Sequence, residues 1–207
     1  MLDIYGVQTN SSFTSSNNNI HICGEITEDL KFNYESYGEK FYTSSIKVQR
    51  TSGSYDEIPL CISERFITED KYNGKIAVIE GQVRTHRLKD ASGESHVAVS
   101  IFVKSMYLVL TNTNENKARF NGYICKVNKP RNTPKGKTIS DVILAVNREF
   151  NKSDYIPCIC WGSVATKAYD AGVGANLDLV GRLQSRSIKD NTRTVYEISV
   201  ANLRVIG

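Results

Sequence analysis

Residues 139–161 read ISDVILAVNREFNKSDYIPCICW. Two segments in this stretch, Ile139 to Phe150 and Tyr155 to Trp161, are rich in β-branched and aromatic residues, which favour strands. Residues 151–154 between them, Asn-Lys-Ser-Asp, are of the types that form turns. The stretch therefore predicts two consecutive strands.

The flanking sequence completes the unit. Residues 163–171 have helical spacing and stop at Gly172 and Gly174, as expected at the C-terminus of a helix. Three further strands are predicted: one from near Ala118 that joins residues 139–150 through a hairpin at Lys135-Gly136-Lys137, one from Leu177 to Ile188, and one from Thr194 to Ile206. The order strand, strand, strand, helix, strand, strand is that of the OB-fold, a five-stranded Greek-key barrel.

The same unit occurs twice. Shifting the sequence by 98 residues aligns its two halves without a gap over about 40 residues, and the alignment resumes after a two-residue slip. Matching pairs include Gly24 with Gly122, Arg50 with Arg148, and, after the slip, Gly81 with Gly181. We therefore expect an all-β chain of two tandem OB-fold domains, each with a short helix between its third and fourth strands.

The domain boundaries follow from composition. Residues 10–19 are polar and of low complexity, which is typical of a flexible segment. Residues 111–116, Thr-Asn-Thr-Asn-Glu-Asn, lie outside both copies and form the natural linker between them. We expect a flexible N-terminal segment over residues 1–19, a first domain over 20–110, a linker over 111–116 and a second domain over 117–207.

Composition restricts the class of protein. Hydrophobic residues make up 40% and charged residues 23% of the 207, a globular balance without an apolar run long enough to span a membrane. The N-terminus has no basic stretch followed by an apolar block, so we expect a cytoplasmic protein. Five scattered cysteines and three histidines form neither a disulfide framework nor a zinc motif, and no catalytic grouping is visible. We expect no metal, no cofactor and no enzymatic activity.

Five blocks of the second copy, in order, carry a resemblance to a known family: residues 129–137, 144–148, 156–162, 181–186 and 196–198. They resemble bacterial and phage single-stranded DNA-binding proteins. The resemblance implies sequence-independent binding and protection of single-stranded DNA in replication, recombination or repair, with association with the nucleoid. It also implies a homodimer that brings four OB domains together, and replication or repair proteins as partners. A protein-interaction adaptor, or an accessory factor of the replication machinery, is the alternative.

Aromatic and basic side chains are the expected contacts, because bases stack on aromatic rings and cations neutralise phosphates. Strand alternation places Tyr155 and Trp161 on one face, and Arg182 and Arg186 share a face of a later strand. The resemblance adds stacking positions at Phe150, Tyr155, Trp161 and Ile188, although an isoleucine cannot stack as a ring does. The full predicted site is Phe150, Tyr155, Trp161, Arg148, Arg186, Arg182, Arg131, Lys135, Lys137 and Ile188.

Two structural explanations compete with this site. Trp161 and Phe150 are also suitable core residues of a small barrel, and strict alternation places Phe150 with the apolar set of its strand. Arg182 and Arg186 also fit an ordinary solvated face.

Charge assigns the binding role to the second domain. Residues 1–110 contain 11 Lys and Arg against 14 Asp and Glu, whereas residues 111–207 contain 15 against 8. The first copy has Ser52, Glu57 and Ser63 where the second has Phe150, Tyr155 and Trp161. We therefore expect the first domain to bind DNA poorly, with only Tyr55, Arg84 and His86 as a residual surface, and to serve mainly as a pairing partner.

Overall fold

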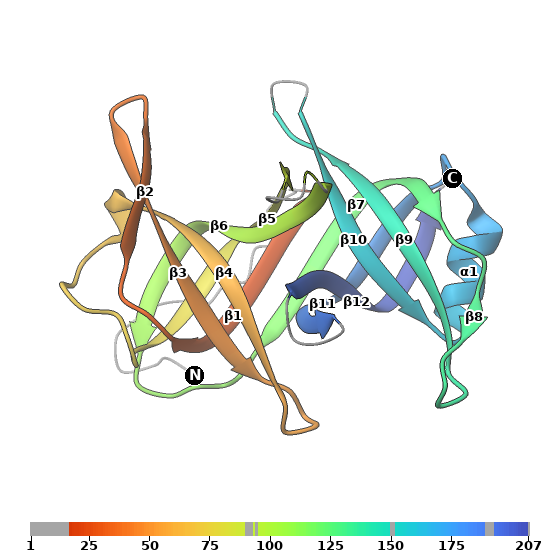
Figure 1. Ribbon diagram of the computed structural model, residues 1–207, viewed down its shortest axis with the longest axis horizontal. Coiled ribbons are helices and arrows are strands. Elements are labelled where there is room, and N and C mark those ends of the chain that lie inside the picture. Colours follow the sequence, from red (N-terminus) through yellow and green to blue (C-terminus); the bar gives the residue numbers. More distant parts are fainter. Residues whose placement is uncertain (1–16, 90–92, 94, 150–151, 189–192, 207) are drawn as a thin grey trace, which may run out of the picture.

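Two β-barrels lie side by side in the computed structural model (Figure 1), which describes residues 17–89, 93, 95–149, 152–188 and 193–206. The first barrel consists of β1 (Asn18–Ile26), β2 (Lys31–Ser36), β3 (Glu39–Gln49), β4 (Tyr55–Ser63), the 3₁₀ turn η1 (Glu64–Phe66), β5 (Ile76–Lys89) and β6 (Ser95–Val109). The second consists of β7 (Asn116–Val127), β8 (Arg131–Asn132), β9 (Thr138–Asn147), β10 (Ser153–Trp161), α1 (Ser163–Ala171), β11 (Asn176–Ile188) and β12 (Arg193–Ile206).

Strand pairing gives each half the OB topology. In the first barrel β1 pairs with β3 and β5, and β4 runs parallel to β6. In the second, β7 pairs with β9 and β11, and β10 runs parallel to β12. The predicted tandem OB-fold is confirmed, with a difference in the helices. The second barrel has the full helix α1 after its third main strand, whereas the first has only the turn η1.

The repeated glycines mark places where strands cross closely. A Cβ atom added at Gly122 would lie 2.4 Å from the Ala145 carbonyl oxygen, and one at Gly181 would lie 2.3 Å from the Ser199 carbonyl oxygen. Gly24 and Gly81 in the first barrel show the same close approach, at 2.4 and 2.5 Å. Only glycine fits these positions without a shift of the backbone, which explains why the two copies share them.

The barrels are joined edge to edge. Strands β1 and β7 pair antiparallel, from Asn18 opposite Phe120 to Ile22 opposite Asn116, so all twelve strands form one continuous sheet. The buried apolar side chains of both halves likewise form one connected core. Asn18 and Asn19 belong to the predicted flexible N-terminal segment over residues 1–19 but are part of β1. Residues 1–16 of that segment lie outside the described residues.

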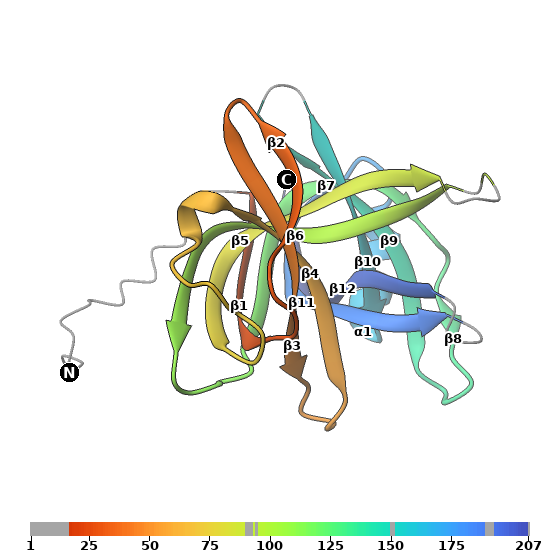
Figure 2. The ribbon, with the colours of Figure 1, turned by 60° about the vertical axis from the view of Figure 1, so that its left-hand side comes forward.

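Each barrel also sends a hairpin against the other. The β5–β6 hairpin extends toward the second barrel, as Figure 2 shows, and the backbone N–H of Thr85 donates to Asp154 Oδ1 at 2.7 Å. Reciprocally, the β11–β12 hairpin brings the backbone N–H of Ser185 within 2.7 Å of Asp56 Oδ1. Asp56 and Asp154 are equivalent in the two copies, so the contact between the barrels is nearly two-fold symmetric.

Candidate nucleic-acid interface

The outer face of β7, β9 and β10 carries exposed aromatic rings. The register places Tyr123 opposite Ala145 and Ala145 opposite Tyr155, so the three residues form one row across the sheet. Tyr123 is 49% exposed and Tyr155 is 51% exposed. Because adjacent strands lie about 4.8 Å apart, two flat rings stand roughly 10 Å apart on either side of the small Ala145.

Trp161 lies in a second row of the same face. It is opposite Ile139, which in turn is opposite Arg131 on β8. The Trp161 side chain is half-buried, and its indole Nε1–H donates to Ser199 Oγ on β12 at 3.2 Å. The ring is therefore fixed at one edge by a hydrogen bond and remains partly accessible to solvent.

We call this surface the second-domain face and define it as Tyr123, Lys126, Arg131, Tyr155 and Trp161. Tyr123 and Lys126 are not in the site predicted from the sequence. Tyr123 could have been found by alternation on β7, because Ala118, Phe120, Gly122 and Ile124 point inward and leave Tyr123 on the outside. Strict alternation would place Lys126 inward, and it is exposed because of the bulge between Ile124 and Lys126, which the sequence pattern does not reveal.

The four predicted arginines all have carboxylate partners. Arg131 pairs with Asp141 on β9, a contact that raises the pKa of the guanidinium through its side-chain hydrogen bond. Arg186 Nε lies 3.1 Å from Glu197 Oε1. Arg131 and Arg186 are about half exposed, so each still presents a partly neutralised cation to solvent.

Arg148 and Arg182 lie instead at the contact between the barrels. Arg148 Nε is 3.1 Å from Asp154 Oδ2, and Arg182 Nη1 is 3.1 Å from Asp56 Oδ2 in the other barrel. Both carboxylates are essentially inaccessible to solvent. Burial lowers the pKa of Arg182, which is consistent with a guanidinium withdrawn from water.

At two aligned positions in the contact between the barrels, the two copies carry glutamine and arginine in the opposite order. The first barrel has Gln82 and Arg84, and the second has Arg182 and Gln184. Within each barrel the glutamine accepts a hydrogen bond from its own arginine, at 2.5 and 3.1 Å. Each arginine then reaches the buried aspartate of the opposite barrel: Arg84 contacts Asp154 at 3.4 Å, and Arg182 contacts Asp56.

The remaining predicted positions differ in their surroundings. Lys135 and Lys137 are exposed at the β8–β9 hairpin, and neither ammonium has an ion-pair partner among the described residues. Ile188 is half-buried at the end of β11. Phe150 lies outside the described residues.

The equivalent face of the first barrel is acidic. There the row that matches Tyr123, Ala145 and Tyr155 reads Glu25, Lys47 and Glu57. Two carboxylates in place of two rings remove the stacking surface and repel phosphate.

The described residues contain no group of three or more His, Cys, Asp and Glu side chains that could hold a metal ion. Burial raises the pKa of the Cys160 thiol to about 12 and also raises that of Cys158 well above its ordinary value. Both thiols are therefore protonated near neutral pH. In the same part of the chain, no helix combines the length and apolar character needed to cross a membrane.

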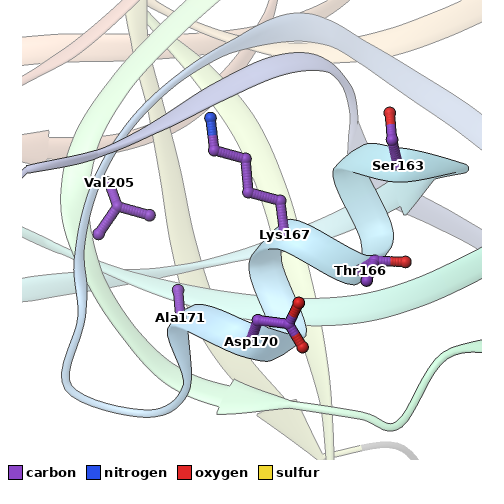
Figure 3. Close-up of a pocket in the computed structure, with 6 residues that line it drawn as sticks. All are labelled: Ser163, Thr166, Lys167, Asp170, Ala171 and Val205. Atoms are coloured by element: carbon purple, nitrogen blue, oxygen red, sulfur yellow. The ribbon is translucent and has the colours of Figure 1, made fainter.

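Helix α1 lies on the side of the second barrel away from the first (Figure 1). A pocket of about 590 Å³ lies beside this helix (Figure 3). Lys167 is the one cation among the six residues drawn in Figure 3, and its ammonium donates to the Leu203 carbonyl at 2.9 Å. No aromatic ring is among the described residues that line this pocket, so these residues lack the chemistry of the second-domain face.

Comparison with known proteins gives a family match for residues 115–206, to the single-strand binding protein family. No curated protein matches the chain. Among solved structures, wild-type single-stranded DNA binding protein from Thermus aquaticus superposes with a TM-score of 0.70 at 18% identity, covering 92% of this chain and 93% of that one. A deletion mutant of the same protein gives 0.69 at 19% identity, with 91% and 94% covered.

A PriB N-terminal domain from Thermoanaerobacter tencongensis matches 46% of the chain at 29% identity, with a TM-score of 0.40. At their low sequence identity, the Thermus aquaticus structures show a shared fold over nearly the whole chain. The family match adds a sequence relationship for the second barrel, where the aromatic face lies. The chain thus resembles the single-strand binding protein family in its tandem OB-fold form, with the sequence match located in residues 115–206.

Proposed function

We propose that the protein binds and protects single-stranded DNA without sequence preference, in replication, recombination or repair, and that it catalyses no reaction. The observation that carries this proposal is the second-domain face, where exposed rings stand beside cations on one side of a sheet. Bases stack on such rings regardless of their identity. The family match of residues 115–206 supports the same function.

The face supports a division of roles. Tyr123, Tyr155 and Trp161 would stack on bases, while Arg131 and the exposed lysines of the β8–β9 hairpin would contact phosphates. The hydrogen bond from the Trp161 indole to Ser199 fixes the ring before DNA arrives. Less side-chain freedom is then lost on binding.

We further propose that two chains associate so that four barrels assemble, as the resemblance implies, and that the protein acts at the nucleoid with replication or repair proteins as partners. Within one chain, two barrels are already paired through β1 and β7. A dimer would therefore use other surfaces of the barrels.

Affinity for oligo-dT is expected to fall steeply with salt. For a single strand, the slope of log affinity against log salt concentration becomes more negative by about 0.7 for each phosphate that the protein neutralises. Four contacts at Lys126, Arg131, Lys135 and Lys137 would lower affinity about 50-fold over a fourfold rise in salt concentration. Fluorescence titration at several salt concentrations measures the slope. The double variant Lys135→Gln, Lys137→Gln should reduce it by about 1.4, and a flat salt response in the wild type would contradict phosphate neutralisation.

Replacing Trp161 with alanine is expected to lower oligo-dT affinity by about 1–3 kcal/mol, because one stacking surface is lost. The anisotropy of a dye-labelled oligonucleotide measures the affinity, and the melting temperature of the same variant is recorded beside it. Tyr107→Ala is the matched control, since Tyr107 is a 64% exposed aromatic residue outside the face. Full binding combined with a strongly lowered melting temperature would instead identify Trp161 as a packing residue.

A further inference from the structure

A groove of about 870 Å³ runs between the two barrels on the outer surface of β4, β5 and β6. Its floor belongs to the first barrel and includes Cys61, Arg84 and Phe102. The second barrel contributes its rim: Arg148, Arg193, Thr194 and Tyr196. This groove is separate from the second-domain face and is the largest cavity among those described above.

Several cationic side chains are among the described residues that line the groove. Arg84, Arg148 and Arg193 line it together with His86 and His96, and no Asp or Glu is among the described residues that line it. Asp154, which pairs with Arg84 and Arg148, lies buried behind them and neutralises only part of this charge. The net acidity of the first domain therefore does not extend into the groove.

One substitution between the copies removes a carboxylate from the first-barrel side of this surface. On the outer side of β12, the Glu197 carboxylate accepts hydrogen bonds from the side chains of Gln184, at 2.9 Å, and Arg186, at 3.1 Å. The aligned position on β6 is Ser100, which carries no charge and lines the groove. The first barrel thus lacks the carboxylate that compensates the cations of the second.

An aromatic residue has also moved between strands. Where β10 has Trp161, β4 has Ser63; where β12 has Ser199, the partner of the Trp161 indole, β6 has Phe102. The Phe102 ring lies 5.6 Å from the Arg84 guanidinium carbon and 5.1 Å from the Lys104 ammonium. The aromatic site lost from the third strand therefore reappears on the fifth strand, beside two cations.

Tyr34 supplies a second and more exposed ring. It lines the groove, is 41% exposed, and stacks on Phe41 with 4.9 Å between ring centroids and 17° between planes. Its hydroxyl lies 3.8 Å from Cys61 Sγ, and burial together with this contact raises the pKa of Tyr34 to about 12. The ring is therefore uncharged near neutral pH and is held flat against a neighbouring ring.

The groove lies close in space to the strand that carries Tyr155. Tyr155 of that face is bound through its backbone N–H to Thr85 Oγ1 on β5, at 2.9 Å. Arg148, on the same barrel as Tyr155, lines the groove. Arg148, which pairs with the neighbouring Asp154, is thus a cation that a single strand bound at Tyr155 would meet on entering the groove.

We propose that this groove is a second binding segment for single-stranded DNA, in which bases stack on Tyr34 and phosphates contact Arg84, His86 and Arg193. The inference rests on the proposed function for its ligand, but it assigns a different site. It gives the first barrel a binding role that uses other strands and other residues than the second barrel does.

The test compares two lengths of oligo-dT. One OB-fold occludes about 4–16 nucleotides, so an oligonucleotide of about 8 fits the second-domain face alone and one of about 30 spans both segments. The variant Tyr34→Leu, Arg193→Gln removes one ring and one cation from the groove. Tyr107→Leu, Lys71→Gln likewise removes one ring and one cation, at exposed positions outside the groove. Arg193→Gln alone provides a milder variant if the double exchange impairs folding.

The groove variant is expected to bind the long oligonucleotide about tenfold more weakly than wild type and the short one equally well. The control pair should match wild type on both, and Trp161→Ala should weaken both. If the groove variant and its control bound the long oligonucleotide equally well, the groove would not be a binding site. An equal loss of affinity for both lengths would also overturn the proposal. Failure of the wild type to bind either oligonucleotide would instead overturn the proposed function itself.

Discussion

Replacing Asp154 with alanine is expected to destabilise the whole chain by roughly 3 kcal/mol, the lower end of the range for breaking a buried ion pair. The carboxylate is fully buried and accepts the backbone N–H of Thr85 at 2.7 Å. Its removal leaves that donor unsatisfied and brings the positive charges of Arg84 and Arg148 together without a counter-charge. Both guanidiniums are partly exposed and can turn toward water, which limits the loss.

Urea denaturation measures this loss as a lower midpoint with an unchanged slope. Asp141→Ala is the control, because Asp141 also pairs with an arginine, Arg131, but at the surface. Exposed pairs contribute about 0–1 kcal/mol, so the control should remain near wild type. Equal losses in the two variants would show that the Asp154 contact stabilises no more than a surface pair.

Phe120→Ala is expected to cost about 3–5 kcal/mol, the usual range for removing a buried phenylalanine side chain. Phe120 is fully buried on β7, opposite Asn18 of the first barrel and Leu179 of the second. Because it lies in the core that both barrels share, one cooperative transition should shift as a whole in calorimetry.

Tyr123→Ala on the same strand is the matched control. Tyr123 is 49% exposed, so its truncation should change the melting temperature little while lowering oligo-dT affinity. Phe120→Ala should do the reverse. Two separate transitions, of which only one responds to Phe120→Ala, would contradict a shared core.

The repeat and the alternation of side chains were sufficient to predict the fold. The predicted helix over residues 163–171 matches α1, because helical spacing and two terminal glycines are local signals. The repeated Gly122 and Gly181 are explained by the close backbone crossings that they permit. These features depend on neighbouring residues or on the copy of the same pattern 98 to 100 positions away.

The electrostatic partners could not be predicted in this way. Arg182 and Asp56 are 126 positions apart and meet only because hairpins from the two barrels cross. Position-by-position comparison of the copies also hid Phe102, since it aligns with Ser199 and not with Trp161. An aromatic residue that has moved to another strand is not detected when equivalent positions of the two copies are compared, although its ring occupies neighbouring space.

The pairing of β1 with β7 has a consequence for how the two faces can change. In a dimer of identical chains every substitution appears on both sides of the symmetry axis, so a residue that improves one face alters the other equally. Here both barrels belong to one polypeptide, and their association does not depend on protein concentration. Each face can therefore accept substitutions independently. The first barrel can carry the carboxylates of Glu25 and Glu57 where the second carries the rings of Tyr123 and Tyr155, and the shared sheet is kept.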